Sequence, residues 1–227
     1  MSYYNFCAED NIMYYNFNKK LKMWYLESYS ELSISKKIID TSYAIFPKRF
    51  YKNINLNIDK KYDFIFIGSL MFDNATYYNR KWIIPFINNN FNSNSYLQFT
   101  DKRTKQNYKI MGNYDYTLLK KGFVPKQVIE KKKNFFDKEY FDNLCQSKFC
   151  LCPAGDSMFS YRFYECLMCK CIPIVKIVDE TYRSKEESKL DYKYYLSSED
   201  EFIYRKDWVE HNYTIFLLYH TLEYRCK

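Results

Sequence analysis

The sequence predicts an α/β fold in which helices flank a parallel sheet. Three short apolar runs carry this prediction, at residues 64–67, 148–152 and 171–175. Each run has the length of a strand and is bounded by turn or helix signals, which is typical of strands buried in a parallel sheet. Because helical stretches lie between these runs, the order of elements favours a parallel sheet with helical crossovers.

The first section of the chain, residues 1–60, is expected to be a short section or packing extension ahead of the main domain. Its apolar residues suggest one or two short helices between Asn11 and Ile39. The pattern changes near residue 61, where the first buried run begins. We therefore expect an N-terminal section over 1–60 and one α/β domain over 61–227.

The first half of this domain opens with the strand at 64–67, which is expected to stop at Gly68 and enter a loop. Residues 80–89 follow as a helix, with Pro85 marking a kink or a late start. Alternation over 96–101 predicts a second strand. The remaining expected elements are a loop and short helix at 112–122, helices at 136–146, 160–170 and 208–223, and a charged irregular stretch at 179–207.

Composition bounds the kind of protein. Hydrophobic residues make up 47% of the 227 residues, which is too many for a disordered chain. The net charge of +8 suits phosphate-bearing partners, and equally suits a lysine-rich surface. The sequence shows neither a secretory signal nor an apolar run of membrane-spanning length. We therefore expect a soluble, cytoplasmic protein without stable membrane insertion, whose eight cysteines are reduced.

Glycine is scarce, with only four residues in the chain, so its placement is informative. Gly68 and Gly155 follow predicted buried strands directly. In open α/β sheets ligands bind beyond the carboxyl ends of the strands, where glycine permits a tight turn or close approach of the backbone. Both glycines are therefore candidate ligand-site residues, and an ordinary turn after a strand is the alternative.

The helix predicted at 160–170 begins in a way that suits a phosphate. Ser160 is a favourable N-cap residue, and a helix N-terminus offers backbone N–H groups and a positive dipole end to a diphosphate. A period of 3.6 residues separates two faces. One face is expected to pack on the sheet and the other to carry the chemistry, respectively Phe163, Cys166 and Leu167, and Arg162, Glu165 and Cys169.

The second face pairs a cation with a carboxylate. The planar fork of Arg162 suits phosphate oxygens, and the carboxylate of Glu165 can accept two hydroxyl hydrogen bonds, as from a ribose. The alternative is a surface pair three residues apart, worth a few tenths of a kcal/mol.

Five clustered cysteines raise the question of zinc. Cys166, Cys169 and Cys171 form a CxxCxC spacing, with Cys150 and Cys152 nearby. The spacing lacks the second CxxC or His pair of usual zinc sites, so we expect these thiols to pack as small hydrophobic groups. Asp-x-Asp, P-loop and dinucleotide motifs are also missing. The sequence therefore predicts no metal site and no cofactor.

The same region resembles the signature of exostosin-type, GT47-like glycosyltransferases. The resemblance lies in Ser147–Pro153, Gly155-Asp156, Ser160, Arg162–Glu165 and Cys171–Val175. It implies the donor-binding lobe of a two-lobed GT-B enzyme, built on a Rossmann-like sheet. In that lobe Glu165 would hold the ribose and Arg162 the diphosphate of a nucleotide sugar, and Gly155, Asp156 and Ser160 would line the loop beneath the donor.

Three features depart from the family pattern. Ala154 stands where the family often has a basic residue, and Lys170 where it usually has glycine. A lysine in a left-handed conformation there would cost about 1–2 kcal/mol. The domain also starts early, near Asp63, so the acceptor lobe is expected to be absent, reduced to residues 1–60, or supplied by a partner chain.

The resemblance implies a glycosyltransferase that moves a sugar, expected from a UDP-sugar, to a hydroxyl of a glycan or glycoprotein without a metal ion. Asp156 and Asp101 are the candidates for the general base that this chemistry requires. A non-catalytic remnant that binds a nucleotide or a protein partner is the alternative. A nucleic-acid partner is not expected, because the sequence shows no nucleic-acid fold signature.

Overall fold

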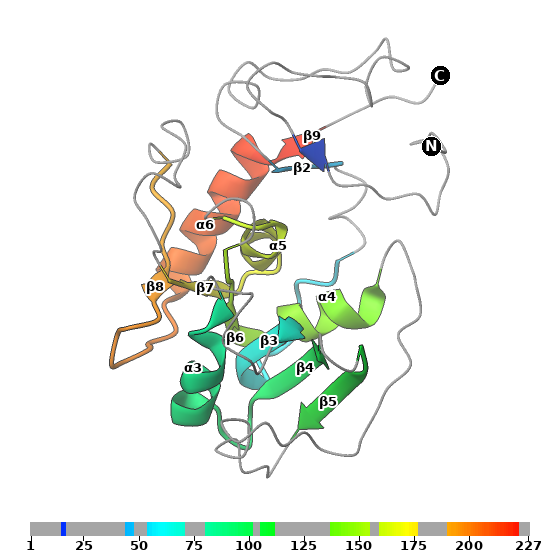
Figure 1. Ribbon diagram of the computed structural model, residues 1–227. Coiled ribbons are helices and arrows are strands. Elements are labelled where there is room, and N and C mark those ends of the chain that lie inside the picture. The colour runs from blue at the N-terminus through cyan, green and yellow to red at the C-terminus, as the bar shows by residue number, and fades with distance from the viewer. Residues whose placement is uncertain are drawn as a thin grey trace.

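A six-stranded sheet forms the centre of the protein (Figure 1). Its spatial order is β5-β4-β3-β6-β7-β8. The computed structural model describes residues 15–16, 44–47, 54–70, 80–101, 105–111, 137–154, 159–176 and 190–222. The strands are β3 (Tyr62–Leu70), β4 (Tyr96–Asp101), β5 (Asn107–Met111), β6 (Ser147–Leu151), β7 (Ile172–Val175) and β8 (Tyr195–Leu196).

The topology has a point where the direction of strand addition reverses. Five neighbouring strands, from β4 to β8 in the sheet, are parallel, and β5 is antiparallel at one edge. The chain places β4 on one side of β3 and then crosses to place β6 on the other side. Such a switch point is where open α/β sheets bind ligands at the carboxyl ends of their strands. The sheet is thus Rossmann-like, as expected.

The pairing of β3 shows where its neighbours separate. On the β6 side the paired residues run only to Ile65 and Cys150. On the β4 side they continue to Leu70 and Asp101. The last residues of β3 therefore lie beside β4 alone, and β3 and β6 part at the switch point.

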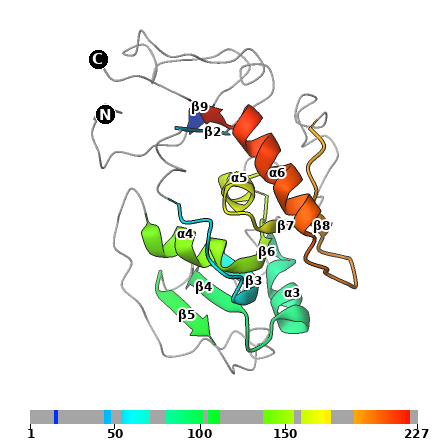
Figure 2. The same cartoon turned by 180° about the vertical axis from the view of Figure 1, so that it is seen from behind.

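Helices cover both faces of the sheet (Figures 1 and 2). Buried residues of α3 pack with Phe64 and Phe66 of β3, whereas those of α4 and α5 pack with Ile65. This division follows from the two-residue period of a strand. No helix in the described part of the chain has the length and apolarity of a membrane span. The helices are α3 (Ile83–Asn90), α4 (Lys138–Cys145), α5 (Tyr161–Met168) and α6 (Lys206–Tyr219).

Of the two interpretations of Pro85 in the helix at 80–89, a kink or a late start, the structure shows the late start. The helix begins at Ile83, so Pro85 falls in its first turn. The backbone N–H groups of a first turn have no partner within the helix, so a proline costs no hydrogen bond there.

The expected end of the first strand at Gly68 is wrong. β3 continues to Leu70, and Gly68 pairs with Phe99 of β4. Glycine usually punctuates a strand, but here its missing side chain leaves room for another group, described below. The sequence interpretation also missed β5 at the sheet edge and β8, which is only two residues long and lies in the stretch expected to be irregular.

A small second sheet lies at the end of α6. It joins β1 (Tyr15–Asn16), β2 (Ala44–Pro47) and β9 (Thr221–Leu222) in the order β1-β2-β9. β1 lies in the stretch expected to contain one or two short helices. The rest of 11–39 lies outside the described residues, as do the loop and helix expected at 112–122.

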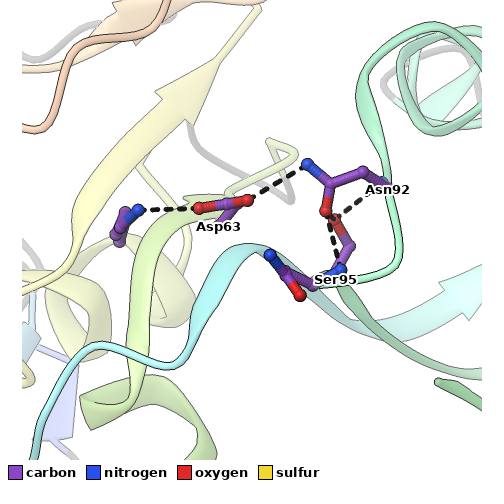
Figure 3. Close-up of polar contacts among 5 residues, drawn as sticks. Asp63, Asn92 and Ser95 are labelled. Atoms are coloured by element: carbon purple, nitrogen blue, oxygen red, sulfur yellow. Dashed lines mark hydrogen bonds and ion pairs between the residues drawn. The ribbon is translucent and has the colours of Figure 1, made fainter. Parts of the chain in front are cut away.

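A polar network closes the amino end of β3 (Figure 3). Asp63 accepts hydrogen bonds from Lys148 Nζ at 2.8 Å and from Asn92 Nδ2 at 3.1 Å. Asn92 in turn exchanges hydrogen bonds with Ser95 in the loop that leads into β4. Burial opposes ionisation of Asp63, but the hydrogen bonds and the charge of Lys148 outweigh it and hold the pKa of Asp63 below its ordinary value.

The end of α5 explains one departure from the family pattern. Lys170 has a φ of 54°, the left-handed conformation that favours glycine. Its N–H donates to Leu167 O, and the N–H of Cys171 donates to Cys166 O, which is the Schellman arrangement. Lys170 Nζ also lies 2.8 Å from Glu210 of α6, an ion pair that offsets part of the strain.

Candidate functional site

Arg162 occupies the place where β3 and β6 part. Its guanidinium carbon lies 5.4 Å from the ring centroid of Phe66, and its Nη1 would lie 2.9 Å from a Cβ added to Gly68. Phe66 belongs to the α3 side of the sheet, whereas α5 packs on the opposite side. The side chain of Arg162 therefore reaches from one face to the other at the carboxyl end of β3, and Gly68 makes room for it.

The side chain of Arg162 is partly buried and incompletely satisfied. Its Nε is buried and has no hydrogen-bond partner among the described residues. Burial lowers the pKa of Arg162, but Tyr140, Cys150 and Glu165 outweigh this effect and keep the pKa above its ordinary value. The group thus stays charged. A buried donor without a partner is costly, and an anionic ligand that accepts from this guanidinium would relieve that cost.

Glu165 lies one turn further along α5 and is only 7% exposed, so the two residues are not the surface pair considered above. Its Oε2 accepts a short hydrogen bond from the hydroxyl of Tyr140. Burial and the charge of Glu165 raise the pKa of Tyr140, which keeps the phenol protonated as a donor. A neighbouring helix therefore fixes the carboxylate of Glu165.

The position of Tyr140 follows from the start of α4. The side chain of Asp137 caps this helix by accepting from the N–H of Tyr140 at 3.0 Å. The cap holds Tyr140 in the first turn, directed at α5. Sequence reasoning predicted the helix but missed this residue, because nothing in the local pattern links Tyr140 to Glu165.

The first turn of α5 differs in one detail from the expectation. Ser160 stands at the N-cap position with extended backbone, but its hydroxyl makes no capping hydrogen bond to a described residue. The N–H of Phe163, one of the two that such a hydroxyl would accept from, donates instead to the carbonyl of Ser160 at 2.9 Å. The predicted N-cap position is thus correct, although the hydroxyl of Ser160 does not cap the helix.

Arg80 brings a second guanidinium to the end of β3, and the sequence interpretation missed it. Its Nη1 donates to the carbonyl oxygen of Ser69 at 3.0 Å. Gly68 and Ser69 are consecutive, so Arg162 and Arg80 contact adjacent residues of one strand. Two features of the sequence could have indicated Arg80. It lies just before α3, and position 154 lacks the basic residue that the family often has.

The remaining predicted site residues are Gly155, Asp156 and Asp101. Gly155 and Asp156 lie outside the described residues. Asp101 ends β4, opposite Leu70, and its side chain is fully buried. The structure thus brings together Arg162, Glu165 and Gly68, with Ser160 at the start of the same helix.

The described cysteines are all buried, as expected for packing groups. The CxxCxC residues do not form one cluster. Instead the Sγ atoms of Cys150, Cys152 and Cys166 all lie within 4.8 Å of one another. Burial opposes ionisation of Cys150, but hydrogen bonds from Cys152 and Cys166 and the charge of Arg162 lower its pKa well below the ordinary value.

Comparison with known proteins shows the family of the chain. The sequence model of the Exostosin GT47 domain matches residues 53–211, which is more than half of the chain and includes every strand of the six-stranded sheet. Curated proteins yield no match. The matched region contains both Arg162 and Glu165 at the switch point of the sheet. The chain therefore belongs to the exostosin GT47 family of glycosyltransferases.

Proposed function

We propose that this chain binds a nucleotide sugar, a UDP-sugar, at the switch point between β3 and β6, and transfers the sugar to a hydroxyl of a glycan or glycoprotein. The observation that carries the proposal is the buried Nε of Arg162, which has no partner among the described residues. Its position at the carboxyl end of β3 is where an α/β sheet binds a phosphate-bearing ligand.

Arg162 would bind the diphosphate and stabilise the charge that develops on the leaving nucleoside diphosphate. A fixed cation in a buried site is effective in this role because it needs no rearrangement during the reaction. Arg80 contacts the next residue of β3 and would supply a second cation. Two guanidinium groups near one diphosphate support a transfer that needs no metal ion.

Glu165 would hold the ribose of the nucleotide. A carboxylate has about four acceptor positions and can accept from ribose hydroxyls. Tyr140 also fixes the orientation of the carboxylate. We assign the acceptor side to residues 1–60 or to a partner chain, and we keep Asp156, which precedes α5 in the sequence, as the candidate base.

Binding of UDP, uridine and 2′-deoxy- or 3′-deoxy-UDP to Arg162→Ala and Glu165→Gln tests these roles. UDP at 100 times its Kd should stabilise the protein by about 2.7 kcal/mol. Arg162→Ala should weaken UDP by about 2 kcal/mol or more, roughly 30-fold, because it removes a buried charge-assisted contact. It should affect uridine far less. Glu165→Gln should instead reduce the preference for UDP over its deoxy analogues.

Arg205→Ala is the matched control, because the guanidinium of Arg205 also lies over an aromatic ring, 5.0 Å from the centroid of Trp208. Equal losses for UDP and uridine in Arg162→Ala, or an equal loss in Arg205→Ala, would contradict the proposed diphosphate contact. Release of UDP from a UDP-sugar with a glycan acceptor tests transfer itself. Binding without release with any acceptor would show a non-catalytic donor lobe.

A further inference from the structure

Three thiols converge between the sheet and α5, beside the proposed donor site. Cys150 lies in β6, Cys152 lies just past its end, and Cys166 lies in α5. Residues two apart in a strand face the same side, and that side is the one that α5 covers. All three cysteines are at most 1% exposed.

The spacing of the sulfur atoms is close to that of a metal site. An ion with metal–sulfur bonds of about 2.3 Å holds three sulfurs about 4.0 Å apart when it lies in their plane. The three Sγ atoms already lie within 4.8 Å of one another. A contraction of less than about 1 Å would therefore complete the site.

We propose that Cys150, Cys152 and Cys166 together bind one thiophilic metal ion, Zn(II) or Cu(I), through three thiolates. Soft sulfur ligands select these ions. No fourth histidine, cysteine or carboxylate joins the group within the described ranges of the chain. Arg162 lies one turn before Cys166 on α5, and its cation would offset part of the negative charge of the loaded site.

The bound ion would tie the end of β6 to the first turns of α5. Cys152 Sγ lies 3.8 Å from the carbonyl oxygen of Arg162, and Cys166 follows Arg162 by one turn on the same helix. The ion would thus fix the backbone from which Arg162 projects. This role does not depend on the donor, so metal binding is measurable without any nucleotide.

The remaining buried cysteines provide matched controls. Cys145, Cys169 and Cys171 are as buried as the three cluster residues but are not part of the cluster. If the cluster were only a packing arrangement, serine substitutions in either set would have the same effect on metal binding. The comparison therefore separates a metal site from a thiol-rich core.

The test uses the full reduced chain with Cys7→Ser and Cys226→Ser, titrated separately with Zn(II) and Cu(I) against a chromogenic chelator. We expect one ion per chain for at least one of the two metals, and the tighter ion identifies the occupant. Cys150→Ser, Cys152→Ser and Cys166→Ser should each weaken binding at least tenfold. Cys145→Ser, Cys169→Ser and Cys171→Ser should bind as the parent does.

If a cluster variant fails to fold, X-ray absorption of the metal-loaded parent protein still tests the proposal, because it counts the sulfur ligands directly. Three sulfur ligands at about 2.3 Å are expected. Less than one tightly bound ion for both metals would overturn the proposal, as would a shell of fewer than three sulfurs or an equal loss in the control variants.

Discussion

The two ends of β3 carry charge in different ways. At the amino end, Asp63 is held by Lys148 and Asn92, so each group has a partner of suitable charge or polarity. At the carboxyl end, two guanidinium groups approach one strand, and the Nε of Arg162 has no partner among the described residues. The charged groups at the amino end satisfy one another, whereas the carboxyl end keeps a donor that the proposed diphosphate would satisfy.

The backbone follows the same division. At the amino edge of the sheet, Lys170 adopts a left-handed conformation, and its ion pair with Glu210 compensates for the strain. At the carboxyl edge, the absence of a side chain at Gly68 allows Arg162 to lie against the strand. The interactions at the amino edge thus stabilise the fold, whereas those at the carboxyl edge are the ones proposed to bind the ligand. Four substitutions test this difference, together with the arginine and glutamate variants described above.

The largest effect on stability is expected for Tyr140→Phe at the carboxyl end. The change leaves the buried carboxylate of Glu165 with one donor fewer, so the free energy of unfolding should fall by about 1–3 kcal/mol. Urea unfolding measures it. Tyr108→Phe is the control, because the Tyr108 hydroxyl donates to the neutral side chain of Gln106. Equal losses in the two variants would remove any special role for the Tyr140 to Glu165 bond.

Gly68→Ala should separate binding from stability. The new Cβ would lie 2.9 Å from Arg162 Nη1 and 3.1 Å from Phe66 Cζ. The flexible arginine would give way, so UDP should bind about tenfold more weakly, equivalent to about 1.4 kcal/mol. The unfolding free energy should change by less than about 1 kcal/mol. Titration calorimetry with Ser69→Ala as control checks this, and unchanged UDP affinity would show that Arg162 need not lie against Gly68.

Asp63→Asn should change how stability depends on pH. Because folding lowers the pKa of Asp63 below its ordinary value of 3.8, its contribution is complete above that value and is lost as the pH falls through the lower, folded pKa. At pH 7 the substitution should cost at most about 1 kcal/mol, since the pair is partly exposed. The substitution should also make the fall in unfolding free energy below about pH 4 less steep.

Thermal unfolding from neutral to acidic pH follows this effect, with the exposed Asp200→Asn as control. Parallel curves for Asp63→Asn and the parent would mean that the amino-end network does not depend on the charge of Asp63.

The smallest effect is expected for Lys170→Gly, which should stabilise the protein. Relief of the left-handed strain is worth about 1 kcal/mol, and loss of the exposed ion pair with Glu210 removes up to about 0.5 kcal/mol. A net gain of about 0.5 kcal/mol should appear in urea unfolding. Glu210→Gln isolates the ion pair, and a net loss in Lys170→Gly would mean that the pair outweighs the strain.

Local pattern was sufficient to predict the regular elements around the site. β4 was predicted over its full length, and β6, β7 and α5 within two residues at each end. These elements show either a continuous apolar run or a clear apolar period in the sequence. β5 and β8 were missed because an edge strand and a two-residue strand leave little periodic signal.

The parts of the site that depend on distant residues could not be predicted in this way. Local sequence predicted that the strand ends at Gly68. The reason for a glycine at this position is instead the side chain of Arg162, which lies far along the sequence. Tyr140 and Arg80 reach the site from other elements, through contacts that no local pattern contains. Resemblance placed Arg162 and Glu165 in one site, and the fold determines what surrounds them.

The pairing of β2 with β9 has a consequence for how the chain folds. Phe46 donates its N–H to the carbonyl of His220 at 2.8 Å, and its ring packs on Phe216 at 5.5 Å between centroids. This contact joins segments from near opposite ends of the sequence. Contacts of high sequence separation slow folding, since the loop must be closed before they add stability. The small sheet should therefore form late, after the six-stranded sheet, and its opening should be an early step in unfolding.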